Sequence, residues 1–220
     1  MKNFQCKIVT WQEIVELSEI LTEKIYESGY NVDTVIGLTR GGWIPARLVC
    51  DHLGIKNLFA IKTEHWGVTA TRDGTARLAQ PLSVDVRGQN VLVVDDITDT
   101  GLSLKLALEN VWQYQPKNVK SALLMHITHS QIVPDFYAKE VSANNWTWFI
   151  FPWNYNEDLR TLITKSFEEL SGGITLTQLK KMFQENYSIN VEKDDLQKTL
   201  EILAKTAIVK EDNGVWVKNK

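Results

Sequence analysis

The sequence predicts an α/β protein built on a parallel β-sheet, and three patterns support this prediction. Short apolar runs alternate with segments of helical periodicity as far as about residue 127. One run, Val91–Val94, is apolar throughout, as expected of a parallel strand that is covered on both faces. Beyond about residue 171 the pattern changes to helices followed by a hairpin, which indicates a second, smaller module.

The first half of the chain supplies the early elements of this sheet. Apolar residues between Ile14 and Ile25 recur at helical spacing, and Gly29 is a suitable residue to end that helix. The segment 64–80 is polar and aperiodic, so we expect a long loop there. The other elements expected here are a strand at 34–38, a helix at 44–53 and a short strand at 58–61.

The second half completes the sheet and adds the small module. After the strand at 91–94 we expect a helix at 101–114 and strands at 121–125 and 148–151. The expected domains are residues 1–170 and residues 171–220, the second being winged-helix-like with two amphipathic helices and a hairpin turning at Asn213–Gly214. The apolar residues of these two helices are Leu176, Leu179 and Phe183, then Leu196, Leu200, Ile202 and Leu203.

Composition narrows the classes of protein. The 220 residues suffice for one α/β domain with a small appendage, and a net charge of −3 argues against a protein that mainly binds nucleic acid. Cys6 and Cys50 form no CxxC pair, so we expect reduced thiols and neither a disulfide nor a zinc site. We see no signal peptide and no apolar run of transmembrane length, so a cytoplasmic protein that does not enter a membrane is expected.

The most informative stretch runs from Val91 to Leu104, with the sequence VLVVDDITDTGLSL. Ligands of open parallel sheets bind at the carboxyl ends of the strands, and the helix that follows offers free N–H groups to a phosphate. Hydroxyl groups of Thr98, Thr100 and Ser103 add donors, and Gly101 allows a close approach of the backbone. The stretch therefore predicts a phosphate-binding loop.

Two adjacent acids, Asp95 and Asp96, precede this loop. Carboxylates beside a phosphate would repel it, so they are better explained as ligands of sugar hydroxyls or of a hard cation. The plainer interpretation is a strand, a turn and a helix with solvated acids, but a pattern of this length makes it the weaker alternative.

This stretch resembles the signature by which type I phosphoribosyltransferases bind phosphoribosyl pyrophosphate (PRPP), with Thr98 standing where an aliphatic residue is commoner. The resemblance implies a Rossmann-like parallel-sheet core with a hood over the base. It implies that Asp95 and Asp96 hold the ribose hydroxyls, directly or through Mg²⁺, and that Asp99 is the general base. By the same resemblance the 5′-phosphate is held by Thr98, Asp99, Thr100, Gly101, Leu102 and Ser103.

A second loop supports the resemblance. Thr39, Arg40, Gly41 and Gly42 follow the strand at 34–38, where the family has its pyrophosphate loop. Backbone N–H groups of a Gly-Gly turn can surround an anion, and Arg40 adds charge. By resemblance to that loop, the Thr39–Arg40 peptide is expected to be cis.

The resemblance extends to a lid and a hood. Residues 64–80 lie where the family has a mobile lid, although an ordinary surface loop is the alternative. Residues 134–137 and 146–155 are similar to the hood of xanthine- and hypoxanthine–guanine-type enzymes. The base-binding residues this implies are Trp148 stacking on the purine, the Phe149 backbone, Asn154 and His126, whereas Trp146 and Trp153 are expected to pack in the core.

The implied reaction transfers the 5-phosphoribosyl group of PRPP to a purine, expected to be a 6-oxopurine, and releases pyrophosphate in nucleotide salvage. Two departures favour weak or altered preference among the bases. The lysine that the family commonly has after the PRPP helix is replaced by His126 or Ile127, and the acid after the hood Pro-Trp is Asn154.

The rival interpretation is a PRPP-sensing transcriptional regulator that joins this fold to a winged helix. Against it, residues 174–220 contain eight Lys and seven Asp or Glu, which is not the charge of a DNA-binding surface. The resemblance implies PRPP and a nucleobase as partners, and the charge of the C-terminal module does not favour nucleic acid. The resemblance also implies a homodimer.

Overall fold

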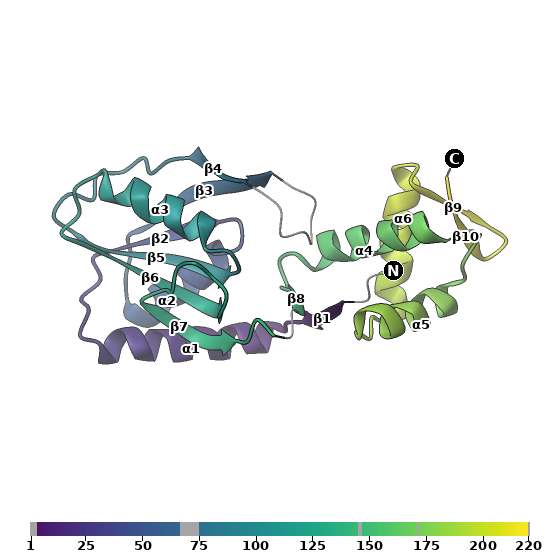
Figure 1. The fold of residues 1–220 in the computed structure, drawn as a ribbon, viewed down its shortest axis with the longest axis horizontal. Helices are drawn as coiled ribbons and strands as arrows, with labels where there is room; N and C mark the ends of the chain where they lie inside the picture. The colour runs from purple at the N-terminus through teal and green to yellow at the C-terminus, as the bar shows by residue number, and fades with distance from the viewer. Residues whose placement is uncertain (1–3, 67–74, 145–146, 171, 220) are drawn as a thin grey trace. The chain divides into compact units, whose positions relative to one another are not determined.

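The computed structural model describes residues 4–66, 75–144, 147–170 and 172–219 (Figure 1). The chain forms two compact units. Residues 11–145 form the sheet unit, and residues 1–10 with 146–220 form the second, which we call the terminal unit. Within the described residues, no helix is both long and apolar enough to cross a membrane.

The sheet unit is built on a six-stranded sheet with the strand order β4-β3-β2-β5-β6-β7. All neighbouring strands are parallel except β4, which is antiparallel to β3 at the edge. The predicted parallel sheet is thus confirmed. The strands are β2 (Thr34–Thr39), β3 (Leu58–Trp66), β4 (Thr75–Gln80), β5 (Asn90–Thr98), β6 (Asn118–Ile127) and β7 (Phe136–Val141).

Three helices cover the two faces of this sheet. α1 (Trp11–Glu27) and α2 (Trp43–Leu53) pack on one face, and α3 (Leu102–Trp112) packs on the other (Figure 1). Helix α3 buries its apolar stripe in a core that includes the central strands β2 and β5, since Leu104, Ala107 and Val111 share this core with Ile36 and Val93. Covering both faces explains why the central strands are continuously apolar.

One part of the predicted layout is wrong. The segment 64–80 is not all loop, because β3 continues to Trp66 and β4 begins at Thr75; the part of the predicted lid at 67–74 lies outside the described residues. Glu64 lies opposite Arg77 and forms ion pairs with Arg77 and Lys62 at 2.9 and 2.7 Å. The polar composition therefore reflects a partly exposed edge hairpin, whose strands need no apolar outer face.

The two stretches likened to a hood lie in different sheets, and the hood itself stays a prediction. Its first stretch, 134–137, leads into β7, which pairs with β6 in the main sheet. Its second stretch contains β8 (Thr147–Ile150), which pairs in parallel with β1 (Gln5–Ile8) in the terminal unit. Neither the strand at 5–8 nor the strand at 136–141 was expected, because short or half-polar strands show little periodicity.

The rest of the terminal unit consists of helices and a hairpin. They are α4 (Tyr155–Glu169), α5 (Leu176–Tyr187), α6 (Lys193–Lys205), β9 (Val209–Asp212) and β10 (Val215–Lys218). Strands β9 and β10 are antiparallel, and Ile174 adds an antiparallel bridge to Trp216. Thr175 caps α5 with a reciprocal capping box to Gln178.

One hydrophobic core joins α4, α5, α6 and the hairpin. Phe167 of α4 is buried with Phe183 of α5, Leu200 of α6 and Trp216 of β10. Ile202 was expected in this core but is 40% exposed, because it follows Leu200 by two positions and so faces away from it on the helix. The domain boundary at residue 170 stays a prediction, while α4 shares its core with the helices beyond it.

Candidate active site

The loops singled out from the sequence lie at the carboxyl ends of β2 and β5, which are neighbours in the sheet. From β2 the chain proceeds to β3 on one side, whereas from β5 it proceeds to β6 and β7 on the other. This is the topological switch point of an open α/β sheet, where ligands of such folds bind. The tertiary structure therefore brings residues 39–42 and 95–103 together.

Loop 39–42 packs directly on the acid pair. A Cβ on Gly41 would lie 2.0 Å from Oδ2 of Asp96, and a Cβ on Gly42 would lie 2.4 Å from the carbonyl oxygen of Val94 and 2.7 Å from Cα of Asp95. Only glycine fits at these two positions, so backbone amides can lie beside the acids. The Thr39–Arg40 peptide is cis, as the resemblance predicted.

The acid pair has an unusual electrostatic environment. Burial raises the pKa of the Asp95 carboxyl well above its ordinary range, and the charge of Asp96 raises it further. The backbone N–H groups of Asp96 and Gly42 act in the opposite direction, and the Asp96 N–H donates to Asp95 Oδ1 at 2.9 Å. Two carboxyl groups in this position would be stabilised by a cation or by hydroxyl donors, the chemistry a sugar or a hard metal ion supplies.

Strand β5 continues through both acids to Thr98, four residues beyond the strand at 91–94 that the apolar pattern indicated. Residues 99–101 then turn sharply into α3, which begins at Leu102. Gly101 precedes this helix with φ of +83°, and a Cβ there would lie 2.8 Å from Oγ of Ser130. The loop thus presents the N-terminus of α3, with Thr100 and Ser103 partly exposed, as an anion site requires.

A second segment holds this phosphate loop in place, namely the turn that follows β6. The N–H of Gln131 donates to the carbonyl oxygen of Thr100 at 3.2 Å. Nε2 of His129 lies 2.6 Å from Oδ1 of Asp99. His129 was not predicted from the sequence. It could have been suspected because it closely follows β6, the strand that pairs with β5 and its acid pair.

His126 lies behind the phosphate loop. Its side chain is buried, its Nδ1 shares a hydrogen bond of 3.0 Å with Oγ1 of Thr98, and its ring contacts Tyr137 at a centroid distance of 5.1 Å. Burial lowers the pKa of His126, with a smaller lowering from His129 and an opposing influence of Glu140. The neutral ring is therefore placed to orient Thr98.

The other expected base-binding residues belong to the terminal unit, whereas residues 39–42 and 95–103 belong to the sheet unit. Trp148 and Phe149 lie on β8 and are partly buried, with Trp148 packed against the core of that unit. Asn154 is the N-terminal cap residue of α4 and makes no side-chain cap hydrogen bond. Trp153 stacks on Phe151 at 5.0 Å, in agreement with a packing role, whereas Trp146 lies outside the described residues.

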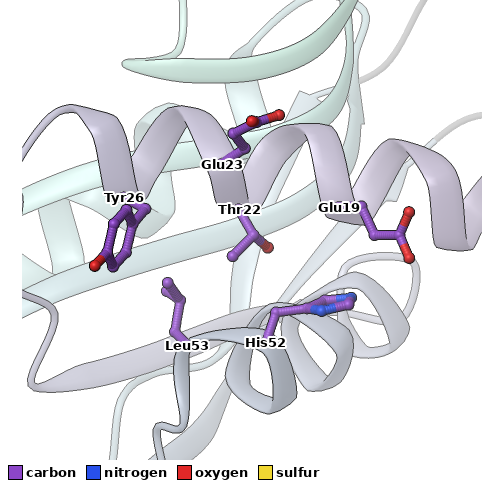
Figure 2. A pocket seen from close by; sticks show the side chains of 6 residues that line it. All are labelled: Glu19, Thr22, Glu23, Tyr26, His52 and Leu53. Carbon is purple, nitrogen blue, oxygen red and sulfur yellow. The ribbon is translucent and has the colours of Figure 1, made fainter.

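A hollow between α1 and α2 lies away from these loops. Figure 2 shows Thr22 of α1 above His52 and Leu53, which end α2, whereas the candidate site lies at the other end of α2. Its remaining lining residues are Glu19, Glu23 and Tyr26. The hollow contributes no residue to the site at the strand ends.

The strand order and the two glycine loops around the acid pair define an open α/β protein with its candidate site at the switch point. The model of the phosphoribosyl transferase domain matches residues 5–159, and the chain belongs to that family.

Relatives and solved structures agree with this assignment. The chain is 28% identical over 149 residues to the xanthine-guanine phosphoribosyltransferase of Cereibacter sphaeroides, covering 66% of this chain and 85% of that protein. The corresponding enzyme of Gluconobacter oxydans is 23% identical over 146 residues, covering 66% and 83%. The crystal structure of a purine phosphoribosyltransferase from Pyrococcus horikoshii superimposes with a TM-score of 0.59 at 29% identity, covering 68% of this chain and 94% of that one.

Proposed function

We propose that this protein is an enzyme that transfers the 5-phosphoribosyl group of PRPP to a purine base, with 6-oxopurines as the expected class, in nucleotide salvage. The observation that carries the proposal is the contact between the Gly41–Gly42 turn and the acids Asp95 and Asp96 at the switch point. The relatives named as xanthine-guanine phosphoribosyltransferases support the choice of a purine.

Each part of the site has a role in this proposal. The loop from Thr98 to Ser103 holds the 5′-phosphate, and the loop from Thr39 to Gly42 holds the pyrophosphate that leaves. Asp95 and Asp96 hold the ribose hydroxyls, and Asp99 accepts a proton from the base. Base recognition is assigned to Trp148, Phe149, Asn154 and His126. His126 also orients the phosphate loop through its hydrogen bond with Thr98.

Mg²⁺ fits the acid pair, because burial and then the charge of Asp96 raise the pKa of Asp95, and a bound cation would stabilise the charged carboxylate against both. Asp95 and Asp96 would hold the ion together with oxygens of PRPP, as Mg²⁺ is commonly held. When bound, the ion would neutralise part of the negative charge that develops on the pyrophosphate.

The direct test is to incubate the protein with Mg²⁺, PRPP and one base at a time, namely guanine, hypoxanthine, xanthine or adenine. Nucleotide formation is followed, and kcat/KM is measured for each base. We expect turnover with the 6-oxopurines, and we expect their kcat/KM values to differ by less than about tenfold. The reason is that β6 ends in His126 and Ile127, without a lysine that could donate to the 6-oxo group. Strongly guanine-selective turnover would contradict the weak preference inferred from the missing lysine. Failure to form any nucleotide would reject the transferase.

We also propose that α5, α6 and the β9–β10 hairpin form a winged-helix-like module. The order of helices followed by a hairpin, with the bridge between Ile174 and Trp216, supports it. On α6, Asp194, Asp195 and Glu201 accompany the lysines, so we propose a packing role rather than DNA binding. A gel-shift assay at low salt with random duplex DNA should show no complex; a complex would favour the regulator.

A further inference from the structure

His129 and Asp99 form a pair that the proposed mechanism has not yet used. Nε2 of His129 lies 2.6 Å from Oδ1 of Asp99, with side-chain exposures of 28% and 41%. Both of these atoms are buried and lie within ion-pair distance, yet no hydrogen bond of regular geometry joins them. Within the described part of the chain, these atoms and Nδ1 of His129 have no well-formed hydrogen bond.

Burying this pair costs folding free energy. A buried polar atom without a good hydrogen bond costs about 1–3 kcal/mol, so its presence calls for an explanation. Because Oδ1 of Asp99 is covered while its side chain is 41% exposed, the exposed surface lies on the rest of the side chain. A ligand can therefore approach Asp99 only from the side away from His129.

The turn that carries His129 is itself held against the phosphate loop. The Ser130 N–H donates to the carbonyl oxygen of Ile127 at 2.9 Å, and the Gln131 N–H donates to that of Thr100 at 3.2 Å. Oγ of Ser130 also lies against Gly101. Movement of this turn would therefore move both His129 and the loop that contains Asp99.

We propose that His129 is a positioning residue that fixes the Asp99 carboxylate in the orientation needed to accept the proton of the base. The inference rests on the proposed transferase function. In that reaction the bond between C1 and the pyrophosphate oxygen breaks, a C1–N bond forms, and the base gives one ring N–H proton to Asp99. The ring of His129 covers Oδ1 of Asp99 at 2.6 Å, which restricts the orientation of the carboxylate and leaves the other oxygen as the one that can accept the proton.

The test compares His129→Ala, His129→Gln and His129→Asn with wild type in steady-state kinetics. We expect His129→Ala to lower kcat by about tenfold or more while KM for PRPP changes by less than about threefold. His129→Gln should recover most of kcat because its amide can occupy the place of Nε2, whereas the shorter Asn cannot reach it. His52→Ala, an exposed histidine at the far end of α2, is the matched control and should behave as wild type.

A double-mutant cycle with Asp99→Ala completes the test. If His129 acts through Asp99, adding His129→Ala to Asp99→Ala should lower kcat no further. Wild-type kcat in His129→Ala, additive losses in the double variant, or a change in KM for PRPP alone would overturn the inference while leaving the transferase intact. Absence of turnover in the wild type would instead reject the proposed function, and this inference with it.

Discussion

The backbone of Gly41 lies against the carboxylate of Asp96. A Cβ at Gly41 would come within 2.0 Å of Oδ2, 2.5 Å of Cγ and 2.8 Å of Oδ1 of that residue. The loop after β2 and the acids of β5 can therefore occupy their positions only while residue 41 has no side chain. This contact joins the two halves of the candidate site.

Gly41→Ala should weaken PRPP binding by about tenfold or more, because either the loop or Asp96 must move by more than an ångström. Isothermal titration with PRPP and Mg²⁺ measures the effect. Gly172→Ala is the matched control, since a Cβ there meets nothing within 4 Å. Equal affinity of Gly41→Ala and wild type would mean that the loop does not contribute to the site in this arrangement.

Replacing both acids, Asp95→Asn with Asp96→Asn, should nearly abolish PRPP binding and turnover while leaving the ligand-free protein at least as stable as wild type. The reason is that burial, and after it the charge of Asp96, raises the pKa of Asp95, so the charged pair is unfavourable without the ligand for which it is retained. Titration calorimetry and thermal unfolding give the two quantities. Asp51→Asn, which removes only an exposed ion pair with Arg47, is the control. Normal affinity and rate in the double variant would refute the assignment of the acids.

Phe183→Ala should destabilise the terminal unit by about 3–5 kcal/mol, because it removes a fully buried aromatic ring from the core shared by α4, α5 and α6. PRPP binding should survive, since residues 39–42 and 95–103 belong to the sheet unit. Differential scanning calorimetry and PRPP titration test the two statements. Ile202→Ala, on the exposed side of α6, should change stability by less than about 0.5 kcal/mol. Loss of PRPP binding in Phe183→Ala would show that the terminal unit supports the site.

The two thiols should react slowly with a thiol reagent at pH 8 in the native protein. Burial raises the pKa of Cys6 to about 12, assisted by the charge of Asp158, and burial raises the pKa of Cys50 to about 11. An ordinary thiol has a pKa of about 8.5. At pH 8 the reactive thiolate is therefore depleted in the folded state and restored on unfolding. Labelling with and without guanidinium measures the ratio. Rapid native labelling of either residue would contradict the buried placement.

Sequence reasoning recovered the elements whose pattern is local. The strand at 34–38 and the helix at 44–53 lie within one residue of β2 and α2, because buried strands and amphipathic helices have a clear periodicity. It missed β4 and β7, which lie at the edges of the sheet, and it interpreted 64–80 as loop. Edge strands are partly exposed, so their polar residues do not distinguish them from loops.

The sequence by itself identified the candidate phosphate loop, the glycine turn and the acid pair, because each is a run of residues whose backbone requirements are local. Only the tertiary structure decided which of these runs meet. It placed Gly41 against Asp96 and His129 against Asp99, and it assigned Trp148 and Asn154 to a separate unit. These relations depend on strand order and on the packing of turns at strand ends, which bring together residues distant in the chain and leave no periodic trace in the sequence.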